Sequence, residues 1–164
     1  MDLLFNELIH LLLSLLVGFI VWKIWGKPLA SFLAALTTGF LVDTDHLIDY
    51  FLAFGLNFRL DYFLSGYHFL KSDKMYIIFH GWEYVVILLV LVSIFRSKFL
   101  KSVFLALSLS LFFHLAFDSF SNEGLTPKSY SIIYRVENNF DLEKLVSKEH
   151  YQYHLRLKKE NDFK

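Results

Sequence analysis

Four long apolar segments constrain the fold of this chain more than any other feature of its sequence. They cover residues 8–25, 29–42, 75–95 and 99–117. A hydrocarbon core of about 30 Å takes about 20 helical residues to cross. The second segment reaches this length only if it continues through a group of charged residues to Leu56. The segments predict an all-α integral membrane protein with about four transmembrane helices.

The composition agrees with this interpretation and excludes several kinds of site. The 164 residues are 55% hydrophobic and include 19 phenylalanines, an apolar share that few water-soluble domains reach. The formal net charge is zero, so nothing indicates a nucleic acid as partner. The chain has no cysteine, which excludes disulfides and thiolate ligands. Any metal site must therefore use histidine, aspartate and glutamate.

The remaining parts of the chain are more polar. No basic residue precedes the first apolar segment, and Lys23 and Lys27 come at or after its end, which predicts an uncleaved membrane helix instead of a secretory signal. Residues 54–74 are aromatic and mildly charged, as expected for an interfacial or re-entrant segment. Residues 138–159 predict a soluble surface helix. We thus expect a helical membrane domain over residues 1–120, containing a metal site, and a polar C-terminal tail over residues 121–164.

Ionisable residues gather at one end of each apolar segment. They are Glu7 and His10 at the first, Asp43, Asp45, His46 and Asp49 at the second, His80 and Glu83 at the third, and His114 and Asp118 at the fourth. If the segments are antiparallel helices, all of these side chains lie on the same side of the membrane. The ionisable residues at the opposite ends are all basic. They are Lys23, Lys27, Arg96, Lys98 and Lys101. Scattered polar residues would not sort in this way.

The spacing of these residues predicts a metal centre. His80 and Glu83 are three residues apart, and the pairs Asp45–Asp49 and His114–Asp118 are four apart, so each pair shares one face of a helix. A buried charge in lipid is costly unless it is paired or binds a cation. The predicted metal ligands are His10, Asp43, Asp45, His46, His80, Glu83, His114 and Asp118. This set suits one or two divalent ions, zinc first, with manganese, iron or magnesium as alternatives.

The same residues resemble a known family, the YdjM-like membrane-bound metal-dependent hydrolases of bacterial and archaeal inner membranes. The resemblance covers residues 10 to about 120. It rests on the early His10, the D-x-D-H block at 43–46, the later His80, and the H-x-x-x-D pair formed by His114 and Asp118. The D-x-D-H block is the most specific of these. The resemblance implies a metal-dependent hydrolase whose ligands are the matching residues.

Two positions depart from the family pattern. Val42 stands where a proline commonly precedes the first aspartate. The sequence FHGWEYV at 79–85 replaces a His-Arg…His-Ser stretch and supplies Glu83 as a further ligand.

We expect a metal-activated water to attack an ester or phosphoester of a lipid or lipid-linked substrate. Glu83 or Asp49 is the expected general base. Two alternatives stay open: a membrane transporter that relays protons or ions through these groups, and a structural or sensing protein whose metal joins the helices. Short basic connections between membrane helices tend to lie in the cytoplasm. Because the basic connections lie at the ends opposite to the predicted site, the site would lie outside the cytoplasm. The sequence does not specify an oligomeric state.

Several other ionisable residues have simpler interpretations. Glu7 is expected to be a solvated charge near the N-terminus. His68 lies in the aromatic segment and is expected to be an ordinary surface residue. His150 and His154 are four residues apart in the predicted surface helix, where they are expected to line its solvated face.

Overall fold

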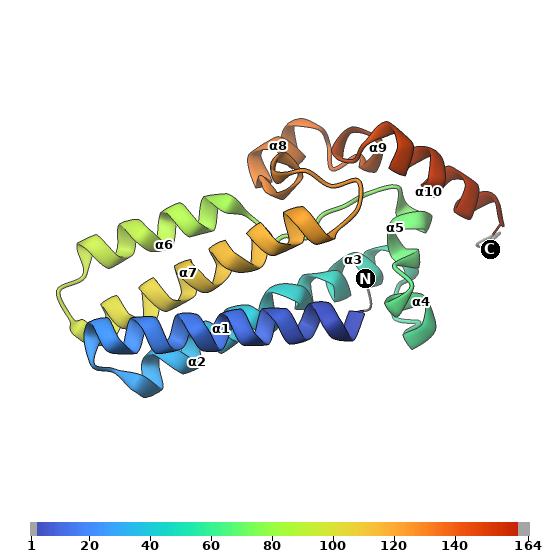
Figure 1. Ribbon diagram of the computed structural model, residues 1–164. Coiled ribbons are helices and arrows are strands. Elements are labelled where there is room, and N and C mark those ends of the chain that lie inside the picture. Colours follow the sequence, from blue (N-terminus) through green and yellow to red (C-terminus); the bar gives the residue numbers. More distant parts are fainter. Residues whose placement is uncertain (1–2, 161–164) are drawn as a thin grey trace. The chain divides into compact units, whose positions relative to one another are not determined.

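A computed structural model describes residues 3–160, with side chains from residue 5, and this part of the chain is all-helical (Figure 1). The only β pairing in it is an isolated bridge between Lys74 and Asp141. The chain forms two compact units, and each is made of two separate stretches of sequence. The first unit consists of Met1–Val42 and Gly81–Ser121, and the second of Asp43–His80 and Asn122–Lys164.

The first unit is a bundle of four helices that lie side by side (Figure 1). They are α1 (Leu3–Trp25), α2 (Pro28–Leu41), α6 (Trp82–Ile94) and α7 (Lys98–Ser121). Two of them, over Phe5–Trp25 and Lys98–Ser121, are long and apolar enough to cross a membrane. The other two, α2 and α6, have 14 and 13 residues. At 1.5 Å per residue they extend only about 20 Å.

Small residues and serine pairs hold α1, α2 and α7 together. Ser14 of α1 and Ser110 of α7 have their hydroxyl oxygens 3.1 Å apart, and Ser110 also donates to the carbonyl of Ala35 in α2 at 2.9 Å. Ser31 and Ser102 form a second buried pair between α2 and α7, at 2.7 Å. Such close contacts between small side chains, with hydroxyls bonded across the interface, are typical of helices that pack within a membrane.

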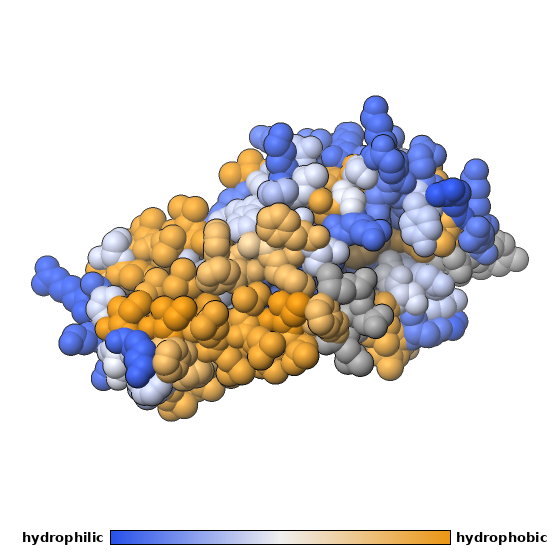
Figure 2. Space-filling view, viewed as in Figure 1, coloured by the Kyte–Doolittle hydropathy of each residue, from blue (hydrophilic) through white to orange (hydrophobic). Residues whose placement is uncertain are grey.

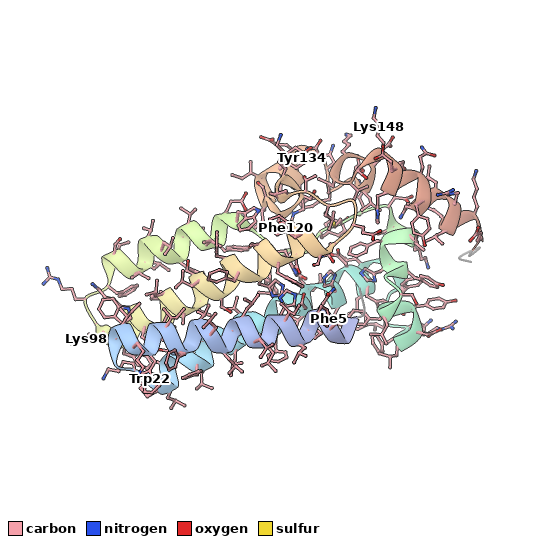
Figure 3. All side chains as sticks on the ribbon, viewed as in Figure 1. Phe5, Trp22, Lys98, Phe120, Tyr134 and Lys148 are labelled. Carbon is pink, nitrogen blue, oxygen red and sulfur yellow. The ribbon has the colours of Figure 1, made fainter. Side chains whose placement is uncertain are left out.

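The outside of the bundle is mostly apolar. Figure 2 shows hydrophobic residues covering the visible face of α1. Leu29 is 72% exposed and Ile24 is 56% exposed. Trp22 and Lys98 lie at one end of this unit, and Phe5 and Phe120 lie toward the other (Figure 3). This apolar surface is the expected exterior of a bundle in lipid.

The second unit consists of short helices. From its first stretch come η1 (Val42–Thr44, which begins one residue earlier), α3 (Asp45–Phe54), α4 (Leu60–Leu64) and α5 (Tyr67–Ser72). From its second stretch come η2 (Pro127–Tyr130), α8 (Ile132–Glu137), α9 (Leu142–Leu145) and α10 (Lys148–Glu160). The residues predicted as a tail thus pack with residues 43–80, and α10 contacts α5. His154 of α10 bonds to Asp73 at 2.9 Å, next to an ion pair of Asp73 with Lys158.

Some local predictions were wrong. The third apolar segment becomes helical only at Trp82, with Gly81 as its N-cap, so His80 and Glu83 do not share a helix face. The second helix ends at Leu41, next to the expected end at Val42, and the 3₁₀ turn η1 follows it, so one helix does not continue through the aspartates to Leu56.

The predicted surface helix is interrupted as well. The backbone of Asn139 and Phe140 is left-handed, and the helical conformation is interrupted again between α9 and α10. His154 in α10 is buried instead of solvated.

Candidate metal centre

Two histidines and one aspartate of the second unit converge on one point. Asp43 lies in η1, His46 follows in the first turn of α3, and His80 lies in the irregular segment that ends this stretch of the unit. Oδ1 of Asp43 is 3.3 Å from Nε2 of His80 and 3.9 Å from Nε2 of His46. One ligand atom from each residue lies within 4.8 Å of the other two.

The spacing within this cluster matches that of ligands around one ion. Ligand atoms at about 2.0–2.1 Å from a tetrahedral zinc ion lie roughly 3.3 Å from one another, and two bound imidazoles have ring centres about 5 Å apart. The ring centres of His46 and His80 are 5.3 Å apart. Two imidazoles and a carboxylate are also a usual donor set for zinc. Both the residue types and their arrangement therefore fit a divalent metal.

A second carboxylate orients His80 from the other side of its ring. Asp45 is fully buried, and its Oδ2 lies 3.0 Å from Nδ1 of His80. The same oxygen accepts a hydrogen bond from the backbone N–H of Phe79 at 2.7 Å. Asp45 thus fixes the proton on Nδ1 and leaves Nε2 to face Asp43. A carboxylate behind a ligating histidine is the usual outer-shell partner in metal sites.

The segment that carries His80 is held by buried charged side chains. Oδ2 of Asp49 accepts hydrogen bonds from the backbone N–H groups of Tyr76 and Ile77, at 3.0 and 3.3 Å. The guanidinium of Arg135 donates to the carbonyls of Ile77 and His80, at 2.9 and 2.6 Å. Ile77 has a φ of 31°, a strained value for a β-branched residue. These bonds replace those of a helix or strand and hold the segment in place.

The charges of this region shift two pKa values. Burial lowers the pKa of His80, but hydrogen bonds to Asp43 and Asp45 raise it more, to about 10. In the metal-free protein the ring is therefore an imidazolium between two carboxylates, and a metal would replace the proton on Nε2. Burial raises the pKa of Asp49 to about 6, although its backbone hydrogen bonds oppose the shift.

The first unit contains another cluster of two histidines and one aspartate. His10 of α1 and His114 of α7 each direct Nε2 at a different oxygen of Asp118, at 3.1 and 3.3 Å. The predicted pairing of His114 with Asp118 on one helix face is confirmed. All three side chains are buried, and this group also has its ligand atoms close enough together to hold an ion.

The arrangement of the rings differs, however. His10 and His114 stack with ring centres 3.8 Å apart and planes 19° from parallel. Imidazoles that share an ion have centres about 5 Å apart, so these rings would have to separate first. As it stands, the cluster is better suited to a carboxylate that bridges two imidazoles.

The structure thus divides the predicted ligands between the two units. Asp45 supports His80 from behind, and Asp49 binds backbone N–H groups. Glu83 lies in the first turn of α6, and its carboxylate is in neither cluster.

The sequence interpretation missed two residues near the second-unit cluster. Arg135 is completely buried, and it comes from the polar region, where no local pattern distinguishes it. His68 is 2% exposed and was expected at the surface. Burial lowers its pKa to about 3, with a smaller effect from His46, so the ring is neutral at physiological pH.

Comparisons of the chain with known protein families, with curated proteins and with solved structures find no match.

Proposed function

We propose that the protein is a membrane-bound metal-dependent hydrolase whose metal ion is held by Asp43, His46 and His80. The observation that carries this proposal is the convergence of two Nε2 atoms on one carboxylate oxygen, with His80 supported from behind by Asp45. Zinc fits this donor set best, and manganese or iron would also use it. The motif resemblance to the YdjM-like hydrolases points in the same direction.

Three protein ligands leave a coordination position for water or substrate, as is usual in catalytic zinc sites. Asp43 and His46 have side chains that are 27% and 31% exposed, so the site can be approached from outside. A divalent ion bound here would lower the pKa of a water molecule to about 7 and make it a nucleophile at neutral pH.

The residues around the ligands would orient the site and accept protons. Asp45 holds the Nδ1 proton of His80 and so keeps its Nε2 available. Asp49 is the candidate general base, because its pKa of about 6 is close to the working pH of such a group. Its Oδ1 has no hydrogen-bond partner among the described residues.

The membrane setting guides the choice of substrate. We propose that α2 and α6 lie in the membrane with α1 and α7, giving four membrane helices in a prokaryotic inner membrane. The apolar exterior and the buried serine pairs support this arrangement. The basic residues at one end of the bundle favour the cytoplasm. The chain leaves α2 at the opposite end, which favours a site outside the cytoplasm. An ester or phosphoester of a lipid or lipid-linked molecule is the substrate class that such a protein would meet.

Metal content of the detergent-purified protein tests the proposal first. We expect mass spectrometry to find about one equivalent of a transition metal per chain. This metal should be present either in the protein as purified or after reconstitution with zinc, manganese or iron. The loaded protein should hydrolyse at least one of p-nitrophenyl butyrate, bis(p-nitrophenyl) phosphate and fluorescent phospholipids. If the wild type binds no metal after reconstitution, the proposal fails. Metal binding without hydrolysis of any of these would favour a structural or sensing role.

One observation favours a second candidate, a proton-relaying membrane protein. Buried polar residues recur on α7 at four- or eight-residue steps, at Ser102, Ser110, His114 and Asp118. Ala106, which is also fully buried, interrupts this row. Proton flux into liposomes that contain the protein, abolished by Asp118→Asn, would support the relay and argue against the hydrolase.

A further inference from the structure

His68 has buried polar atoms without any partner in the described part of the chain. The residue lies in α5, is 2% exposed, and neither Nδ1 nor Nε2 has a hydrogen-bond partner among the described residues. A neutral imidazole offers one N–H donor and one lone pair. Burying both without a bond is unfavourable, and such groups in native proteins call for an explanation.

The aromatic rings around His68 do not hydrogen-bond its nitrogen atoms. Its ring lies 4.1 Å from the ring of Phe69 and stacks on Phe63 at 6.0 Å. The ring of Tyr50 is also 6.0 Å away, but its hydroxyl donates to the carbonyl of Asn57 and accepts from the backbone N–H of Arg59. For packing alone, a phenylalanine would fill this aromatic site without an unsatisfied polar group.

Another ring contact connects His68 to the candidate metal centre. The ring of His46 contacts His80 at 5.3 Å between ring centres, and it contacts His68 at 6.1 Å. The shorter distance matches two imidazoles on one ion, for which about 5 Å is expected. The longer distance places His68 beside His46 and beyond the spacing expected of two ligands of one ion. A histidine next to one ligand of such an ion could hydrogen-bond a small molecule bound to it.

We propose that His68 is a catalytic residue that hydrogen-bonds the water destined to attack the substrate at the Asp43–His46–His80 site. Its lone pair accepts a hydrogen bond from that water and orients the oxygen, and its N–H is available to an oxygen of the substrate. The unpartnered nitrogens are then explained, since their partners are not part of the chain. The inference rests on the proposed function, because it requires a metal at this site.

Cobalt titration of the full-length protein in detergent tests the inference, with readouts that do not depend on turnover alone. The variants are His68→Phe, which fits the aromatic site, and His68→Gln, which retains a donor and an acceptor. Tyr50→Phe is the matched control, since it alters the same aromatic site without touching the cluster. The measurements are cobalt affinity, the pH midpoint of the change in the visible spectrum, and hydrolysis of bis(p-nitrophenyl) phosphate.

We expect cobalt affinity within about threefold of wild type in His68→Phe, because no ligand is lost. The spectral midpoint should rise by about one pH unit. Turnover should fall at least about 10-fold, which is less than the 10²–10⁴-fold typical of an acid–base group, because His68 only orients the water. His68→Gln should recover part of both, and Tyr50→Phe should match the wild type.

Three results would overturn the inference while leaving the proposed function standing. Wild-type values in His68→Phe would mean that the ring only packs. A loss of cobalt affinity of more than about 100-fold, with a changed spectrum, would mean that His68 is itself a ligand, and a loss of about 10–100-fold would mean that it only supports a ligand from behind. If the wild type binds no cobalt, the proposed function fails, and this inference fails with it.

Discussion

The two clusters of the molecule contain the same residues, two histidines and one aspartate, but differ in how those residues are held. In the first unit, His10 and His114 stack at 3.8 Å and share one carboxylate. In the second unit, the rings of His46 and His80 are 5.3 Å apart and their Nε2 atoms point to one oxygen. A donor set therefore does not define a metal site. The separation of the rings, and the carboxylate that fixes the tautomer, distinguish the two.

The largest expected effect is on metal affinity, and it separates the two clusters directly. His46→Ala should weaken zinc binding more than about 100-fold, because losing a ligand exceeds the 10–100-fold cost of losing an outer-shell partner. The matched change His114→Ala should alter affinity less than about threefold. Competition titration with a zinc chelator measures both. Equal losses in the two variants would mean that the clusters are not distinct in metal binding.

The pH dependence of stability tests the role of Asp49, whose carboxylate holds the segment that carries His80. The folded protein holds the Asp49 proton more tightly than the unfolded chain, with a pKa of about 6 against 3.8. Asp49 therefore lowers the free energy of unfolding progressively as pH rises from about 4 to 6, by at most about 3 kcal/mol. Asp49→Asn cannot ionise, so its stability should fall less over this range. Thermal unfolding from pH 4 to 7 compares the two, and parallel profiles would contradict the prediction.

The support behind His80 gives the next effect. Asp45→Asn keeps the shape of the side chain but removes the negative charge beside Nδ1, and it should weaken zinc binding about 10–100-fold. Asp61→Asn is a suitable control, because the Asp61 side chain is exposed and forms an ion pair with Arg59, away from the cluster residues. Isothermal titration calorimetry would show the difference. If Asp45→Asn binds zinc as tightly as the wild type, then the Asp45 carboxylate does not distinguish the two clusters.

The smallest effect concerns the bundle. Ser110→Ala removes a hydroxyl bonded to both Ser14 and Ala35, and hydrogen bonds between membrane helices contribute about 0.6 kcal/mol on average. We expect a loss of about this size in unfolding titrations with SDS, and no change in zinc binding. Ser93→Ala is the control, because that exposed hydroxyl bonds within its own helix. A loss of zinc binding in Ser110→Ala would couple the bundle to the metal site.

The sequence predicted the four helices of the bundle and two of the three local pairs, because these depend on residues close in the chain. The four apolar segments became the four helices of the first unit, and Asp45 and Asp49 share α3 as expected. His80 was wrongly placed in the third helix, because Gly81 is the N-cap of that helix and His80 precedes it. Neither the stacking of His10 on His114 nor the contact of Asp45 with Nδ1 of His80 has a sequence signature, since both depend on residues at least 35 positions apart.

The buried residues that surround the site were harder still. Arg135 bonds to backbone carbonyls 55 and 58 residues away, and a carbonyl is present at every position of a sequence. His68 sits among aromatic residues that also suit a membrane interface. Its burial depends on how α3 packs with α5, which residue types alone do not determine.

The position of Arg135 in the chain has a consequence for how the protein is made. A ribosome completes all four helices of the bundle at Ser121, and it has by then also added every predicted metal ligand. The guanidinium that holds the carbonyls of Ile77 and His80 follows only later. We expect a chain ended by a premature stop codon after Ser121 to insert its hydrophobic helices into the membrane normally and to bind no metal at the Asp43–His46–His80 cluster.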